Sequence, residues 1–76
     1  MTTLAELRRN QARARVLEVS GDDEISQRLL EMGITPGVEV KYVGKALLGD
    51  PLEIELRGYR LSLRRQEASR VTIEPM

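Results

Sequence analysis

The sequence predicts a mainly β domain: a small barrel of about five short strands with one short α-helix. Three observations support this prediction. Apolar and polar residues alternate in three segments, glycine or proline separates these segments, and one stretch repeats apolar residues at helical spacing. At 76 residues, the chain has the length of a single domain, residues 1–76, with a thin aliphatic core.

The first predicted strand covers residues 13–20. Its apolar residues change phase between Val16 and Leu17. Because a change of phase turns the apolar side chains to the other face, it indicates a β-bulge or a strongly bent strand. Before this strand, Leu4 and Leu7 predict a short apolar lead-in of one helical turn.

A helix is predicted to begin at residues 22–24 and to end at Gly33. Aspartate is a good N-cap, and acidic side chains in the first turn interact favourably with the helix dipole. Gly33 suits the left-handed residue after a helix, with an apolar contact from Ile34. Residues 35–38, with proline second and glycine third, are typical of a type II turn. The predicted apolar side of the helix comprises Ile25, Leu29, Leu30 and Met32.

Three strands with period-two alternation follow, each with one face toward the core. A hairpin at Arg57-Gly58 joins the last two, residues 65–69 suit a single helical turn, and residues 71–73 give a last short strand. Because closing so few strands on themselves removes exposed edges, we expect an SH3-like β-barrel with the helix over one end. The core-facing residues are Val38, Val40 and Tyr42, then Leu52, Ile54 and Leu56, then Tyr59, Leu61 and Leu63.

The composition removes most routes to catalysis and metal binding. The chain has no cysteine and no histidine, so it lacks disulfides, thiolate ligands and the commonest general base and metal ligand. Ser20 and Ser26 therefore have no histidine to activate them. Met32 falls on the apolar helix face, which assigns it to the core. We expect no catalytic residue, no metal site and no cofactor, and leave weak iron binding by carboxylates open.

Charge and hydropathy limit the partners. Twelve basic residues balance twelve acidic ones, so bulk attraction to nucleic acid or to a membrane surface is not supported. A stacking platform for bases is also missing, because Tyr42 and Tyr59 both fall on core-facing positions. No segment approaches the ~20 apolar residues of a membrane helix. The N-terminus lacks a signal-peptide pattern, so we expect a cytoplasmic protein. From the balanced charge and the missing stacking platform, we expect no nucleic-acid partner.

The segment from Ala46 to Pro51 is unusual for a turn, because two leucines run into a Gly-Asp-Pro sequence. Adjacent residues of an extended segment point opposite ways, so one of Leu47 and Leu48 is expected to cap the barrel and the other to face solvent. We therefore predict a partner contact here, with a charged rim from Arg57 and Arg60. The alternative is a lid on the core. The predicted contact residues are Ala46, Leu47, Leu48, Gly49, Asp50, Pro51, Arg57 and Arg60.

Residues 28–40, RLLEMGITPGVEV, resemble the signature of the FeoA family, small accessory proteins of bacterial ferrous iron transport. Residues 48–54, 57–64 and 67–73 resemble its later blocks, so the similarity covers nearly the whole chain. The family usually has a glycine where this chain has Asn10. Because asparagine tolerates positive φ better than most residues, this turn can be kept.

The resemblance implies an SH3-like fold and association with FeoB, a membrane transporter with a cytoplasmic GTP-binding domain. It implies a cytoplasmic accessory protein of ferrous iron uptake that binds and modulates FeoB, with weak self-association left open. The alternative is a free-standing, metal-responsive regulatory or ligand-binding SH3-like domain. The missing histidine and cysteine argue against a tight transition-metal sensor, and an enzyme would lack a nucleophile and base.

Overall fold

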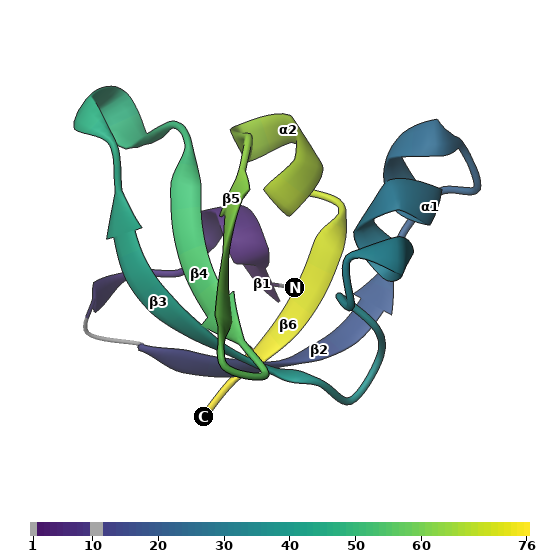
Figure 1. Ribbon diagram of the computed structural model, residues 1–76, viewed down its shortest axis with the longest axis horizontal. Helices are drawn as coiled ribbons and strands as arrows, with labels where there is room; N and C mark the ends of the chain where they lie inside the picture. Colours follow the sequence, from purple (N-terminus) through teal and green to yellow (C-terminus); the bar gives the residue numbers. More distant parts are fainter. Residues whose placement is uncertain (1, 10–11) are drawn as a thin grey trace.

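The computed structural model describes residues 2–9 and 12–76, without the side chain of Leu47, and shows one strongly curled antiparallel sheet of six strands (Figure 1). The strand order is β1-β6-β2-β3-β4-β5. The strands are β1 (Thr2–Thr3), β2 (Arg13–Val19), β3 (Glu39–Lys45), β4 (Leu52–Leu56), β5 (Tyr59–Leu63) and β6 (Val71–Pro75). The helices are α1 (Glu24–Glu31) and α2 (Arg65–Ala68), and the 3-10 turns include η1 (Leu4–Glu6) and η3 (Leu47–Gly49).

The mainly β, SH3-like architecture agrees with the prediction, with two differences of detail. The extra strand is β1, whose two residues pair with β6 through Thr2 and Ile73. Two threonines carry no apolar alternation, so the sequence gives no signal for this strand. The sheet is also not closed, because β1 and β5 stand at its two ends and do not pair with each other in the described part of the chain. The predicted turn at residues 65–69 is α2.

The predicted bulge in β2 is confirmed. The register of β2 against β6 shifts between Val16 and Glu18, which leaves Leu17 as the extra residue. Leu17 is 48% exposed, whereas Val16 is fully buried. The bend lets β2 pair with β3 through residues 13–15 and with β6 along its length, so this strand joins the two halves of the sheet.

The core is aliphatic and lies inside the curl of the sheet. The two leucines of the lead-in, Leu4 and Leu7, are completely buried, and η1 packs against α2 and β6. Because residues three apart lie on one side of a helical turn, a single turn inserts both leucines. The other buried apolar residues are Ala14, Val16, Leu29, Ile34, Val38, Val40, Leu52, Ile54, Leu56, Leu63, Ala68, Val71 and Ile73.

Two side chains assigned to the core lie at the surface instead. Leu30 is 43% exposed, because one step along a helix from the buried Leu29 turns it out of the packed side. Tyr59 is 44% exposed, and its hydroxyl donates a hydrogen bond to the carbonyl oxygen of Met32. The ring therefore covers the end of α1. The prediction that Tyr59 enters the core is wrong, because its hydroxyl group finds its hydrogen-bond partner at the surface.

Candidate interaction surface

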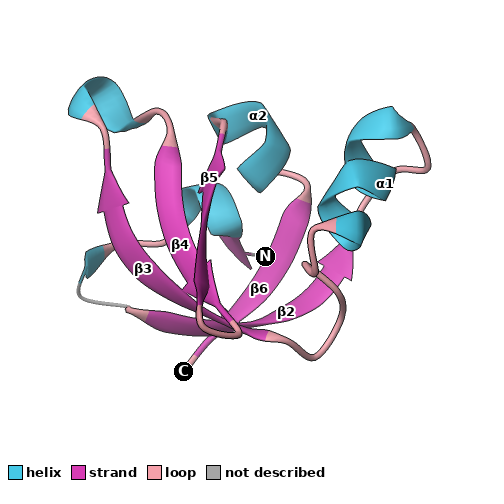
Figure 2. Ribbon diagram, in the orientation of Figure 1, coloured by secondary structure: helices cyan, strands magenta, loops and turns pink. Residues whose placement is uncertain are grey.

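Residues 46–51, which we call the tip, connect β3 to β4. Figure 2 shows the tip, α2 and α1 at one end of the molecule and the β4–β5 hairpin at the opposite end. The backbone N–H of Gly49 donates to the carbonyl oxygen of Ala46 at 2.8 Å, and the N–H of Ala46 donates to that of Pro51 at 3.0 Å. The tip is therefore a hydrogen-bonded 3-10 turn, and the expectation of an extended segment is wrong.

Leu48 occupies the outermost part of the tip. Its side chain is 92% exposed and its φ is 73°, in the left-handed region. A leucine in this conformation costs about 1–2 kcal/mol, and such local strain is concentrated at functional positions. Full exposure of a large apolar side chain adds no stability to the fold. We therefore treat Leu48 as the centre of a candidate contact. The predicted role of the Leu47 side chain lies outside the described residues.

The tip is braced by α2. A carboxylate oxygen of Asp50 accepts a hydrogen bond from the backbone N–H of Arg65 at 3.0 Å. The Arg65 guanidinium lies over Gly49, where an added Cβ would come within 3.2 Å of its Nη2. Beside them is a shallow pocket of about 560 Å³, lined by Asp50, Arg64, Arg65, Gln66 and Ser69. The tip thus carries one exposed leucine, Leu48, and has Arg64 and Arg65 beside its Asp50.

Arg57 and Arg60 do not form a rim around the tip. Arg57 follows β4 at its far end, and five strand residues at ~3.3 Å each separate the two places by roughly 17 Å. Arg57 and Gly58 have φ values of 50° and 85°, so the predicted hairpin is a type I′ turn. Arg64 and Arg65 lie closer to the tip, beside Asp50. The sequence could not show this, because the hydrogen bond that the Arg65 N–H donates to Asp50 joins residues 15 positions apart.

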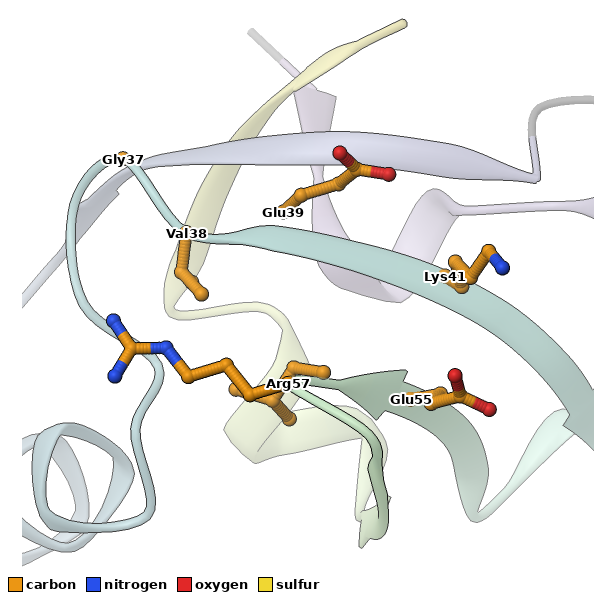
Figure 3. Close-up of a pocket in the computed structure, with 7 residues that line it drawn as sticks. Gly37, Val38, Glu39, Lys41, Glu55 and Arg57 are labelled. Atoms are coloured by element: carbon orange, nitrogen blue, oxygen red, sulfur yellow. The ribbon is translucent and has the colours of Figure 1, made fainter.

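A second hollow lies at the hairpin end, with a volume of about 480 Å³ (Figure 3). Figure 3 shows the Arg57 side chain extending away from Lys41 and Glu55. Glu39 accepts a hydrogen bond from Arg13 at 2.5 Å, which lowers the pKa of Glu39 and raises that of Arg13. The charged side chains that line this hollow include both signs and are open to solvent. The lining residues are Gly37, Val38, Glu39, Lys41, Glu55, Leu56 and Arg57.

The acidic residues at the start of α1 have a structural role, as predicted. Asp23 is the N-cap and accepts from the N–H of Ser26 at 3.2 Å. Its carboxylate also forms a salt bridge at 2.5 Å with Arg70, the residue just before β6. The hydrogen bond from Arg70 and then that from the Ser26 backbone hold the pKa of Asp23 well below its usual range. These contacts fasten α1 to the sheet.

Metal ligation and membrane insertion are two further properties that bear on function. Within residues 2–9 and 12–76, no three side chains of histidine, cysteine, aspartate or glutamate gather where they could hold a metal ion. None of the described helices is both long enough and apolar enough to span a membrane. Together, fold and tip define the class: a small, mainly β, SH3-like domain with an exposed leucine on one turn.

Comparisons with known proteins identify the family. A model of the FeoA domain matches residues 2–75. The Fe(2+) transport protein A/Fe(2+) transporter FeoB fusion protein of Porphyromonas gingivalis is 34% identical over 59 residues, which make up 78% of this chain but 7% of that protein. The chain belongs to the FeoA family, whose members are associated with ferrous iron transport and are not known as enzymes.

Solved structures agree with this assignment. The crystal structure of Stenotrophomonas maltophilia FeoA complexed with zinc is 36% identical, with a TM-score of 0.84, over 97% of this chain and 91% of that one. The NMR structure of a FeoA-like protein from Clostridium acetobutylicum is 34% identical, with a TM-score of 0.87, over 100% and 91% of the two chains. The zinc ion belongs to the Stenotrophomonas structure.

Proposed function

We propose that this protein is a cytoplasmic accessory factor of ferrous iron uptake that binds FeoB and modulates it. The observation that supports this most directly is the fusion of the FeoA-like part with FeoB in one polypeptide of the Porphyromonas relative. Joining two domains gives them a high effective concentration, so their contact needs little affinity of its own. Added as a separate chain, this domain has to bind through its own surface, so substitutions there test the contact.

The tip is the surface that we propose for this contact. Its shape is fixed before binding by the turn hydrogen bonds and by the brace from Asp50 to Arg65, which lowers the ordering cost of association. Leu48 supplies apolar area that a partner can bury. Arg64 and Arg65 line the pocket beside Asp50 and would steer an acidic partner surface. Arg57 and Arg60 lie outside this surface.

A binding assay with purified full-length FeoB tests both parts of the proposal. We expect the wild-type chain to bind in at least one of three states: nucleotide-free, GDP-bound or GTP-bound. Leu48→Ser should weaken binding by about tenfold or more, because burying a leucine contributes roughly 1.5–3 kcal/mol. Leu17→Ser is the matched control, since Leu17 is also exposed but lies in the β2 bulge.

The outcomes separate the partner from the surface. Absence of binding in all three nucleotide states would reject FeoB as the partner. Binding that Leu48→Ser and Leu17→Ser weaken equally would reject the tip as the contact. Modulation is measured separately as the GTP turnover of FeoB with and without saturating wild-type chain, and an unchanged rate would reduce the proposal to binding alone.

Titration with iron separates the proposed function from the alternative, a metal-responsive domain. We expect anaerobic titration of the chain with Fe²⁺ to show no site tighter than about micromolar, because carboxylates without histidine or cysteine suit harder ions. Zn²⁺ is the comparison ion, since the Stenotrophomonas relative was crystallised with it. A stoichiometric sub-micromolar iron site would favour the metal-responsive alternative.

A further inference from the structure

The outer edge of β5 is open. Within the part of the chain that the structure describes, β5 pairs with β4 alone. Leu56 and Tyr59 flank a two-residue hairpin, so they form a hydrogen-bonded pair, and so does every second pair after them. Arg60 and Ser62 occupy the positions between. Their backbone N–H and C=O groups therefore point to the free edge, where a further strand would find them.

A groove runs beside this edge. It has a volume of about 530 Å³ and lies between β5 and α1, with α2 at one end. At one end of the groove, the hydroxyl of Tyr59 donates a hydrogen bond to the carbonyl oxygen of Met32. At the other end, Arg28 forms a salt bridge with Glu67 at 3.6 Å. Figure 1 shows α1 standing apart from β5. The lining residues are Ile25, Arg28, Met32, Ser62, Arg64, Gln66 and Glu67.

The charges at this edge indicate an acidic occupant. Arg60 in β5 and Arg64 at the groove carry positive charge, whereas Glu67, the acidic residue of the groove lining, is already paired with Arg28. The strand already paired with β5 shows the matching chemistry, because β4 alternates leucine or isoleucine with glutamate and sets Glu55 opposite Arg60. A second copy of β5 in this place would set arginines among arginines, and like charges across strands are destabilising. Charge therefore favours a different partner over self-association.

We infer that β5 accepts an extended strand from a protein partner in which acidic and apolar residues alternate. The backbone of that strand pairs with Arg60 and Ser62 by strand addition. Its acidic side chains lie on the side of Arg60 and Arg64, and its apolar side chains lie on the side of Leu61. This site shares Arg64 with the pocket beside the tip but does not include Leu48, and it does not depend on FeoB being the partner.

The test uses the whole chain and a blocked seven-residue peptide that alternates glutamate and valine. We expect the peptide to shift the NMR signals of β5 and α1, and to slow the amide exchange of Arg60 and Ser62 at least tenfold at saturation. The amide of Leu61, already bonded to β4, should change little. Two further peptides carry N-methyl groups at odd or at even positions. One should lose binding and the other keep it, because only alternate peptide N–H groups face β5.

Protein variants test the same edge. Ser62→Pro removes the outward N–H and should abolish binding, whereas Ser62→Ala should bind as the wild type does. Arg60→Glu should weaken binding about fivefold or more. If Ser62→Pro does not fold, the N-methylated peptides decide the question with the wild-type chain.

Three results would overturn the inference. The first is an equal effect of both N-methylated peptides. The second is peptide-induced shifts confined to residues 46–51. The third is concentration-dependent protection of Arg60 and Ser62 without peptide, which would make a second copy of the chain the occupant.

Discussion

The turn after α1, residues 32–38, and the tip, residues 46–51, redirect the chain in similar ways but expose different surfaces. Each contains two residues with positive φ. In the turn after α1 both are glycines, Gly33 and Gly37, and the apolar residues that follow each of them are buried. In the tip one of the two is Leu48, whose side chain is 92% exposed. The first turn serves the core, and the second presents a side chain to solvent.

Their hydrogen bonds show the same division. At the end of α1, the N–H groups of Gly33 and Ile34 donate to the carbonyl oxygens of Leu30 and Leu29 at 3.0 and 3.1 Å, which is a Schellman motif. The N–H of Gly37 then donates to Val16 in β2 at 2.7 Å. The turn after α1 is thus linked to the sheet by a hydrogen bond between backbone groups. The tip is tied to α2 through the side chain of Asp50, so this link depends on one replaceable residue.

The largest expected effect is at Gly33. We expect Gly33→Val to lower the free energy of unfolding by about 2–4 kcal/mol, because valine resists positive φ and its Cβ would come within 2.8 Å of the Tyr59 hydroxyl oxygen. Gly37→Val is the matched control: its φ is similar, but no atom of the described residues lies within 4 Å of an added Cβ. It should cost about 1–2 kcal/mol. Thermal or urea unfolding measures both, and equal losses would show that the clash with Tyr59 is relieved without cost.

The pH dependence of stability tests how α1 is fastened at its other end. Because the pKa of Asp23 is lower in the folded chain than in the unfolded chain, the unfolded chain binds more protons as pH falls below about 4. The contribution of Asp23 is therefore present at neutral pH and is lost as pH falls. Asp23→Asn should unfold at a lower temperature at pH 7 and lose less on going to pH 3. Asp22→Asn is the neighbouring control, and equal pH profiles for the two variants would contradict this role of the Asp23–Arg70 pair.

A smaller effect is expected at the brace of the tip. Asp50→Ala removes the acceptor for the Arg65 N–H and should cost about 0.5–1.5 kcal/mol. Asp50→Asn keeps a carbonyl oxygen in the same place and should cost less. Amide exchange at Arg65, compared between the two variants, measures the bond directly. No change at Arg65 in Asp50→Ala would mean that the tip is held by its own turn alone.

Most of the fold could be predicted because its determinants are local. The phase change at Val16–Leu17 indicated the bulge, and the glycine-proline spacing at residues 33–37 indicated the helix end and the turn. The site could be predicted only in part. Exposure of one leucine in the tip was expected, but from an extended conformation that the 3-10 turn does not have. The arginines beside Asp50 could not be predicted, because their position depends on where α2 packs. Tyr59 was misplaced because alternation gives the face of a strand and not its depth in the core.

The smallest effect on stability, and the most informative, is expected at Leu48. Leu48→Asn should leave the free energy of unfolding unchanged or raise it by up to about 1 kcal/mol, because asparagine tolerates left-handed φ and no buried contact is lost. Leu30→Asn is the control, since Leu30 is exposed at 43% but lies in a helix, where asparagine costs about 0.5 kcal/mol or more.

The same Leu48→Asn chain should bind FeoB more weakly, while Leu30→Asn should bind as the wild type does. Stability and binding would then move independently at the tip, as they should where a side chain is strained and exposed for contact. A lower unfolding midpoint for Leu48→Asn would show instead that Leu48 packs on the domain. The tip would then be a second structural turn like the one after α1, and the difference between the two regions would disappear.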